Sequence, residues 1–271
     1  MPPSKFLEQL KIILEEKIPV ISFAMGNLPI QLVEQIHSLS PSSKIMSMVT
    51  TVQEAIDVAR NGADIIVAQG AEAGGHRSTF NVPLENENGT LPLIGTMTLV
   101  PQIVDALSGI EDKSQDEVYN IPVIAAGGIA DGRGLVAALA LGAQGVVIGT
   151  RFLVASESAA FQAYQERLLA AKESDTIITR AFSGRPARGL RNQFIDEYRK
   201  SGPRPLAWPF QALAADDIYA AAQKQNNADY FPLLAGQGVG LLKDNQKYNA
   251  EEIIQELVTQ ANHTLSKYFS E

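Results

Sequence analysis

The sequence predicts an α/β fold built on a parallel β-sheet. Short apolar runs without polar alternation, which are typical of strands buried on both faces, recur along the N-terminal half of the chain. Stretches with helical periodicity separate these runs, and this is the pattern of successive βαβ units. Two of the runs end in glycine clusters, at the place where such proteins keep their functional loops. The predicted strands are residues 18–24, 44–49, 64–68, 122–126 and 145–148.

A predicted helix precedes the first strand, and others connect the strands that follow. Residues 5–17 place Phe6, Leu10 and Leu14 on one face of the first helix. Thr51 and Glu54 form a capping box at the start of a helix that runs to Asn61, and Gly62 follows as a C-terminal cap. The other helices predicted in this half are residues 29–37, 100–107 and 134–141.

Beyond Arg151 the chain is richer in alanine and in helical periodicity. Asn249 and Glu252 form the N-terminal cap of the last helix. Nothing indicates an independent second domain, so we expect one domain over residues 1–271, in which 155–271 includes helical additions. The charged segment 112–119 is expected to be an exposed loop insertion. The predicted elements of this half are helices 155–172, 211–225 and 250–268 and a short piece at 176–182.

Composition excludes several classes of function. The chain has 271 residues and a net charge of −8, which argues against nucleic acid and against an anionic membrane as partners. No apolar run reaches the roughly 18 residues of a membrane span, and the N-terminus lacks a signal peptide's apolar core, so we expect a cytoplasmic protein. The absence of cysteine excludes thiolate ligands, and three histidines leave little material for a metal site, so none is predicted.

The loop after the third strand carries the first candidate site. Gly70, Gly74 and Gly75 lie within six residues, more than a packing turn needs, and they favour a backbone held close to a flat or charged ligand. His76 follows at the tip of the loop, where an α/β protein keeps its chemistry. The alternative is that His76 only caps a turn through hydrogen bonds.

The second glycine cluster predicts a phosphate site. Gly127 and Gly128 follow the fourth strand and open a helix, and Gly149 and Thr150 end the fifth strand. Glycine lets backbone N–H groups point at an anion, and a helix N-terminus adds partial positive charge. We therefore expect Gly128, Gly149 and Thr150 to hold a phosphate monoester, unless the glycines only permit tight turns. Asp131 is predicted to cap the helix that follows.

Taken together, several motifs resemble the nitronate monooxygenase family, a group of flavin enzymes. The resemblance implies a (β/α)8 TIM-type barrel, a non-covalent FMN, and oxidation of alkyl nitronates by dioxygen to a carbonyl compound and nitrite. The motifs that carry it are residues 69–77 (QGAEAGGHR), 99–102 (LVPQ), 125–134 (AAGGIADGRG), 148–152 (IGTRF), 182–189 (FSGRPARG) and 235–237 (AGQ).

The resemblance also implies roles for individual residues. Gln69 and Gly74 would contact the flavin beside the isoalloxazine, and His76 would face the substrate as a base for nitroalkanes or as a partner of the nitronate oxygens. The rest of the cofactor site would be Gly127, Gly128, Val147, Ile148, Gly149 and Thr150, and Gly75, Arg77 and Ser183 would lie on the substrate side.

For three charged residues a structural role competes with the chemical one. Arg77 could pair with an anionic substrate or with Glu72 or Asp64. Glu72 is expected to bond backbone N–H groups, and Arg151 is expected to form an internal ion pair.

The sequence departs from the family in its strands. Five are found where the barrel requires eight, and they resemble strands 4–8, so the chain reads as N-terminally truncated and the barrel as incomplete. Three functions stay open. The protein could oxidise nitronates, or it could be an FMN-dependent NAD(P)H reductase of the enoyl-carrier-protein or quinone reductase type. It could also be a non-catalytic remnant or interaction partner. Whether the chain forms a homo-oligomer stays open.

Overall fold

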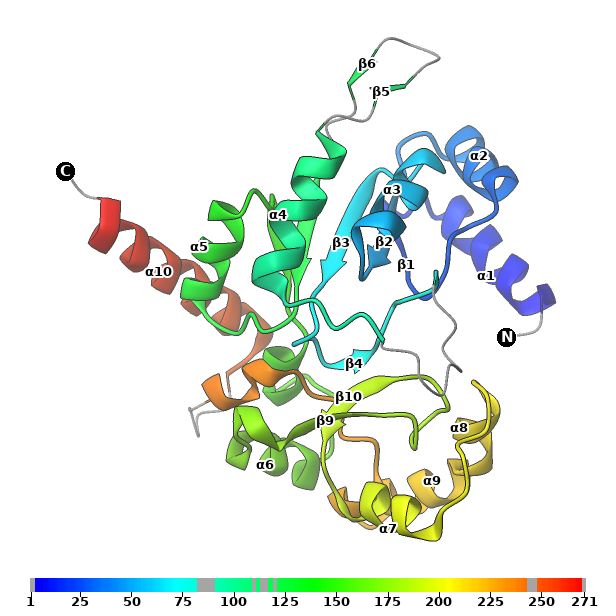
Figure 1. The fold of residues 1–271 in the computed structure, drawn as a ribbon, viewed down its shortest axis with the longest axis vertical. Coiled ribbons are helices and arrows are strands. Elements are labelled where there is room, and N and C mark those ends of the chain that lie inside the picture. Colours follow the sequence, from blue (N-terminus) through cyan, green and yellow to red (C-terminus); the bar gives the residue numbers. More distant parts are fainter. Residues whose placement is uncertain are drawn as a thin grey trace.

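The computed structural model describes residues 3–81, 91–108, 111–112, 117–118, 121–242 and 248–269. Its centre is a five-stranded parallel sheet in the order β1-β2-β3-β7-β8, which follows the order of the strands in the chain (Figure 1). This confirms all five predicted strands. Their bounds are β1 (Val20–Phe23), β2 (Lys44–Val49), β3 (Ile65–Gln69), β7 (Val123–Ala126) and β8 (Gly145–Val147).

The strand register brings the carboxyl ends of the sheet together. Val49 of β2 pairs with Ala68 of β3, and Ala126 of β7 pairs with both Gln69 and Val147. β3 is buried on both faces from Ile66 to Gln69, as its unbroken apolar run predicts. Among the described residues neither β1 nor β8 pairs with a strand on its outer side, so the sheet does not close into a barrel.

Helices pack beside the sheet and bury its core. The central cluster joins Ile66 of β3 to Leu99, Ile103 and Leu107 of one helix. None of the described helices is both long and apolar enough to span a membrane. The helices of this layer are α1 (Pro3–Glu15), α2 (Ile30–Leu39), α3 (Val52–Arg60), α4 (Thr96–Leu107) and α5 (Gly132–Ala140).

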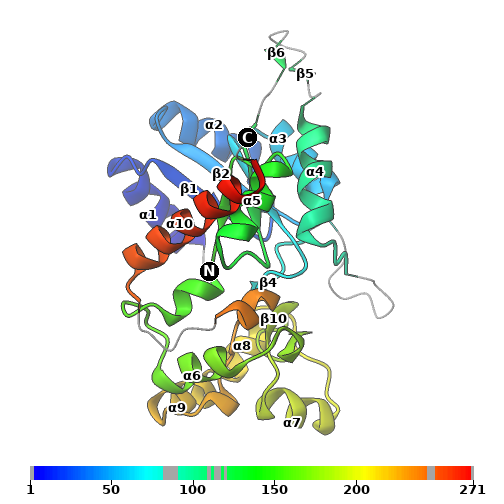
Figure 2. The same cartoon turned by 90° about the vertical axis from the view of Figure 1, so that its left-hand side faces the viewer.

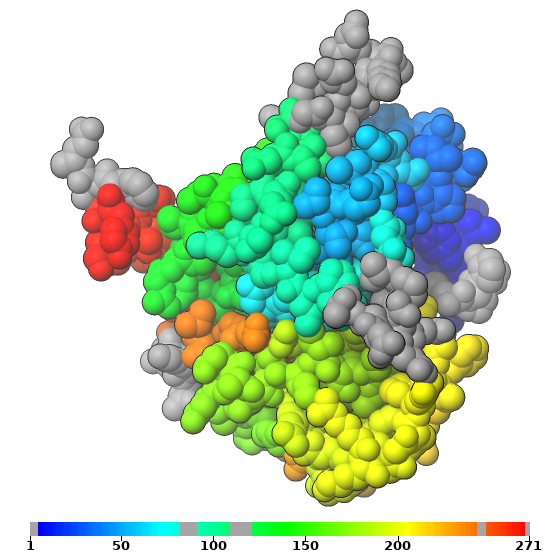
Figure 3. Space-filling model, viewed as in Figure 1, coloured from blue at the N-terminus to red at the C-terminus, as the bar shows by residue number. Residues whose placement is uncertain are grey.

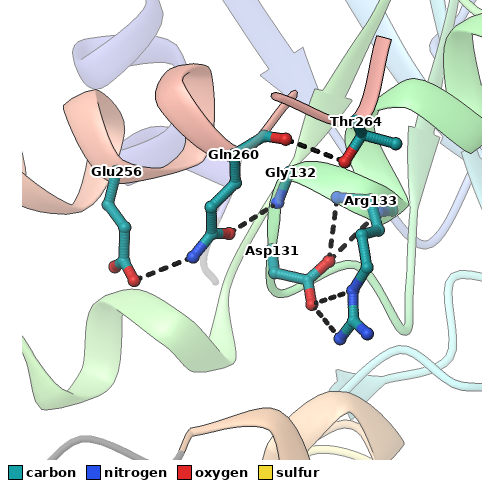
Figure 4. Close-up of polar contacts among 7 residues, drawn as sticks. Asp131, Gly132, Arg133, Glu256, Gln260 and Thr264 are labelled. Carbon is teal, nitrogen blue, oxygen red and sulfur yellow. Dashed lines mark hydrogen bonds and ion pairs between the residues drawn. The ribbon is translucent and has the colours of Figure 1, made fainter. Parts of the chain in front are cut away.

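The last helix, α10 (Ala250–Phe269), crosses back to pack against α5 (Figure 2). Asp131 caps α5 by accepting from the N–H groups of Arg133 and Gly134, as predicted. At the same helix end the N–H of Gly132 donates to Oε1 of Gln260 at 3.0 Å (Figure 4). A Cβ at Gly132 would stand 2.3 Å from the backbone nitrogen of Ala261, so the helices meet this closely only at a glycine.

A smaller antiparallel sheet lies beyond the carboxyl ends of the parallel strands (Figure 1). It joins β4 (Gly75–His76), from the glycine loop, to β10 (Ala187–Leu190) and β9 (Thr176–Thr179), in the order β4-β10-β9. Helices surround it in the lower part of Figure 1, and the space-filling view shows this part of the chain packed against the part above it (Figure 3). The surrounding helices are η1 (Thr150–Val154), α6 (Gln162–Ala170), η2 (Glu173–Asp175), α7 (Gln193–Ser201), α8 (Phe210–Ala214), α9 (Asp216–Lys224), η3 (Ala228–Tyr230) and η4 (Gln237–Leu241).

Several predicted elements of this half were wrong in extent. The helix predicted over 155–172 is only α6, because serine side chains before it compete for the backbone: Oγ of Ser158 accepts from the N–H of Ala160. The helix predicted over 211–225 is interrupted at Ala215, between α8 and α9. The piece at 176–182 begins as strand β9. The predicted insertion at 112–119 overlaps a short antiparallel pair, β5 (Glu111–Asp112) and β6 (Glu117–Val118).

Candidate functional site

A cavity of about 260 Å³ lies at the carboxyl ends of β2, β3, β7 and β8. Seven glycines are among its 17 lining residues, and none of the 17 is charged. Eight of the residues predicted to form the site line it: Gln69, Gly74, Gly75, Gly127, Gly128, Val147, Gly149 and Thr150. The other lining residues are Met48, Ala73, Ala126, Ile129, Ala130, Leu153, Leu234, Gly236 and Gly238.

A larger cavity of about 800 Å³ lies between α6, β9 and α7, away from the strand ends. Charged side chains line it, and two of its arginines, Arg167 and Arg191, form partly exposed ion pairs with Asp229 and Asp196. Its polar lining is that of a surface groove between helices. The smaller, glycine-lined cavity is therefore the candidate site.

Glycine is required at different positions of the cavity for different physical reasons. A Cβ at Gly74 would stand 2.5 Å from the nitrogen of Gly236, so two loops meet there at backbone distance. Gly127 has a φ of +112°, which other residues rarely adopt. Neither requirement applies to Gly149, since its φ is −109° and no atom lies within 4 Å of a Cβ built on it. What a side chain at Gly149 would occupy is open space beside the cavity.

The cavity also offers backbone donors for an anion. Among the described residues, none accepts a hydrogen bond from the N–H of Gly128, Gly149 or Thr150, and all three residues line the cavity. The hydroxyl of Thr150 accepts from the N–H of Gly236 at 3.0 Å, so its own proton is left to donate. Free amides with glycine approaches are the donor set that a phosphate group requires, and the residues present fit that group.

One predicted cofactor residue lies differently. Ile148 does not line the cavity, because its side chain packs against Ala155, Ile253 and Leu257 on the α10 side. Val147 and Gly149, its neighbours on both sides, do line it. The alternation of side chains along a strand explains this difference.

Gln69 fixes the shape of the glycine loop. It is 4% exposed at the end of β3, and its Nε2 donates to the carbonyl of His76 at 3.0 Å. Its Oε1 accepts from the N–H of Ser78 at 2.9 Å. One side chain therefore ties both backbone positions that flank Arg77 to the edge of the parallel sheet.

His76 lies on β4, where it pairs with Ala187 of β10. Its Nε2 is 2.6 Å from Oγ of Ser183, the residue predicted on the substrate side. Burial, together with the positive charge of Arg185, lowers the pKa of His76 below its ordinary value of 6.5. The imidazole is therefore neutral at neutral pH. Nδ1 has no hydrogen-bond partner among the described residues.

Arg77 does not take the substrate-side place predicted for it. Its side chain is fully buried, and Nη1 and Nη2 donate to the carbonyls of Gly70 and Gln69 at 2.6 and 3.0 Å. Burial lowers its pKa to about 10. It forms no ion pair with Glu72 or Asp64 either, since Asp64 pairs with His37 and Lys44. Arg77 therefore binds backbone carbonyls where a substrate or a carboxylate was expected.

Two other charged residues take their predicted structural roles. Glu72 accepts from the N–H of Thr96 at 2.9 Å and so caps the first turn of α4. Arg151, which is buried, forms an ion pair with the partly exposed Glu256 of α10 at 2.6 Å. No group of three or more His, Asp or Glu side chains that could hold a metal ion occurs within the described ranges.

Sequence reasoning missed the apolar wall of the cavity. Met48, Leu153 and Leu234 come from three distant segments, and nothing distinguishes them from other core residues. Gly236 does carry a signal, because it stands in one of the quoted motifs.

Comparisons with known proteins point to one family. The model of the family described as nitronate monooxygenase matches residues 3–260. A probable nitronate monooxygenase of Staphylococcus saprophyticus is 38% identical over 97% of this chain and 68% of the relative. These matches do not support the truncation predicted at the N-terminus.

Two solved structures share the fold. A nitroalkane oxidase from Streptomyces ansochromogenes superimposes with a TM-score of 0.83 at 30% identity, covering 97% of this chain and 69% of that one. FabK from Thermotoga maritima gives a TM-score of 0.74 at 32% identity, covering 95% and 72%. The fold described above therefore matches the larger part of each of these two structures.

Proposed function

Since this chain belongs to the nitronate monooxygenase family, we propose that its strand-end cavity holds FMN and that the protein oxidises alkyl nitronates with dioxygen to a carbonyl compound and nitrite. The family and its structural relatives make it an enzyme of a flavin oxidoreductase group that acts on small molecules.

One observation carries the proposal. The amides of Gly128, Gly149 and Thr150 have no described partner and line one cavity, next to the loop that holds Gln69 and Gly74. The three amides would bind the phosphate of FMN, and the Gln69–Gly74 side would lie against the isoalloxazine. Gly149 supports the proposal, because neither close packing nor a positive φ requires a glycine at this position.

When bound, the flavin supplies the redox chemistry, and the protein supplies position and proton control. The hydroxyl of Ser183 can donate to Nε2 of His76 or accept from it, so it accommodates either neutral tautomer of the imidazole. With a nitronate, which has already lost its carbon-bound proton, Nδ1–H of His76 would donate to a nitronate oxygen. With a neutral nitroalkane, the unprotonated Nδ1 would accept the proton.

The test is nitrite release from a small alkyl nitronate by the FMN-loaded protein. We expect His76→Gln to lower kcat by about a hundredfold while FMN stays bound. The matched control is His263→Gln on the exposed side of α10, which should keep full activity. If His76→Gln binds FMN and its turnover is unchanged, His76 has no catalytic role.

The reductase stays the second candidate, because the stretches at residues 74–76 and 126–129 also resemble those of flavin-dependent enoyl-carrier-protein reductases. Anaerobic mixing with NADH or NADPH separates the two. Rapid bleaching of the flavin by a nicotinamide favours the reductase, whereas bleaching only by a nitronate favours the oxygenase.

A further inference from the structure

Three arginines are buried around the glycine loop. Arg77, Arg185 and Arg188 are 0%, 7% and 8% exposed, and none of them belongs to an ion pair within the described residues. A buried guanidinium without a carboxylate partner is costly, because no opposite charge in direct contact offsets its lost hydration.

The three side chains bind main-chain carbonyls instead. Arg77 donates to the carbonyls of residues 69 and 70, and Nε of Arg188 donates to that of Ala71 at 2.8 Å. Nε and Nη2 of Arg185 donate to the carbonyls of Arg77 and Thr79 at 3.0 and 2.6 Å. These carbonyls lie on the two flanks of residues 72–76, so the arginines hold both ends of the segment that carries His76. We call this group the arginine clamp.

The charges around the arginine clamp do not cancel. The carboxylates that act on it are those of Glu54 and Glu72, two against three guanidinium groups. Both are occupied by backbone amides: Glu54 accepts from the N–H groups of Thr50 and Phe80, and Glu72 from that of Thr96. His76 is neutral, so one positive charge remains in surroundings of low dielectric.

The hydrogen bonding of Arg77 is also incomplete. Its Nε is the only buried side-chain nitrogen or oxygen among the described residues without a hydrogen-bond partner. Its Nη1 and Nη2 donate to the carbonyls of Gly70 and Gln69, so the guanidinium lies directly behind Gln69, which lines the cavity.

We propose that the arginine clamp makes the strand-end site selective for anionic ligands, through one uncompensated positive charge behind the glycine loop. The inference rests on the proposed function and deepens it: planar oxyanions, nitronates and carboxylates alike, bind in preference to neutral ligands of the same shape. The arginines are positioning residues that do not touch the ligand. A charge held at this depth acts at a distance because little water screens it.

The experiment compares propanoate with propanamide, two planar ligands of nearly equal size that differ in charge. Each is titrated into the FMN-loaded protein, and binding is followed by the flavin difference spectrum. The same titrations without flavin are followed by the NMR signals of the histidine rings, of which the chain has three. If the chain retains no FMN, the proposed function fails, and the flavin-free titration still tests the clamp.

Arg185 is the residue to vary, because it is also the charge that acts on His76. Arg185→Gln removes the charge, and Arg185→Lys keeps it while losing the fork of donors. The control is Arg191→Gln, since Arg191 is exposed and pairs with Asp196 away from the cavity. Circular dichroism identifies any variant that does not fold, and Arg188→Gln with Arg188→Lys then serves as the second pair.

We expect the unsubstituted protein to bind propanoate at least about tenfold more tightly than propanamide. Arg185→Gln should lose that preference and raise the pKa of His76, while Arg185→Lys and Arg191→Gln should keep both values. Equal binding of the two ligands by the unsubstituted protein would overturn the inference. So would equal losses in the folded Gln and Lys variants, because the effect would then come from geometry and not from charge.

Discussion

Nε2 of His76 lies 2.6 Å from Oγ of Ser183, although the two residues are 107 positions apart in the chain. The contact exists because β4 carries His76 into the small antiparallel sheet, and β10 follows directly after the turn that holds Ser183. The same turn places Arg185 so that it donates to the carbonyls of Arg77 and Thr79, on both sides of Ser78. The segment after β9 therefore fixes the candidate base from two directions.

The first prediction concerns this hydrogen bond. Ser183→Ala should lower kcat for a nitronate by about tenfold, because the imidazole loses the hydrogen-bond partner that holds its orientation. FMN affinity should not change, since Ser183 does not line the cavity. Steady-state kinetics with a flavin titration measures both, and Ser156→Ala on an exposed loop is the control. A loss of FMN without a change in turnover per bound flavin would contradict the assignment.

The second prediction concerns pH. The pKa of His76 is lowered in the folded protein, so between that value and 6.5 the unfolded chain binds the proton and the folded chain does not. The free energy of unfolding should therefore fall as the pH drops through this window and should be fully retained above 6.5. Urea denaturation at pH 7.5 and pH 5.5 measures the difference, and His76→Gln should make it smaller. An unchanged difference in His76→Gln would show that other groups carry it.

The sequence allowed the layout of the site to be predicted, because strand ends, glycine loops and caps are local signals. The five strands are confirmed, and so are the roles of Asp131, Glu72 and Arg151. The capping box at Asn249 and Glu252 is also confirmed, since each side chain accepts from the other residue's N–H.

What could not be predicted depends on contacts between distant segments. In the first predicted capping box, Thr51 does accept from the N–H of Glu54, but the Glu54 carboxylate accepts from Thr50 and from Phe80, which is 26 residues away. The sequence predicts a substrate or a carboxylate as the partner of Arg77 for the same reason: the carbonyls that it binds come within reach only when the loop folds back.

The third prediction follows from Glu54. This carboxylate is fully buried and accepts from the N–H groups of Thr50, Phe80 and Asn81. Glu54→Ala would leave these donors without a partner and should lower the free energy of unfolding by about 3 kcal/mol or more. Thermal or urea denaturation measures the loss. Gln53→Ala, at an exposed position of the same helix, should stay within about 0.5 kcal/mol of the unsubstituted protein, and a similar loss in both variants would refute the role of Glu54.

The fourth prediction separates a ligand role from a packing role among the glycines. Gly149→Val should weaken FMN binding by at least about tenfold, because its side chain enters the open space beside the cavity, and the melting temperature of the flavin-free protein should change little. Gly127→Ala should instead lower that melting temperature, since a Cβ would stand 2.9 Å from the nitrogen of Ala73 at a φ of +112°. Gly26→Ala is the control, because Gly26 also has open space around it but does not line the cavity. Normal FMN affinity in Gly149→Val would place the phosphate elsewhere.

The measurement that tests the account most directly is the visible spectrum of the purified protein after addition of FMN and removal of the unbound flavin. We predict a retained and perturbed flavin spectrum with one FMN per chain, which the Gly149→Val variant loses. A colourless protein would contradict the central claim, because the glycine-lined cavity would then not be a flavin site in this chain.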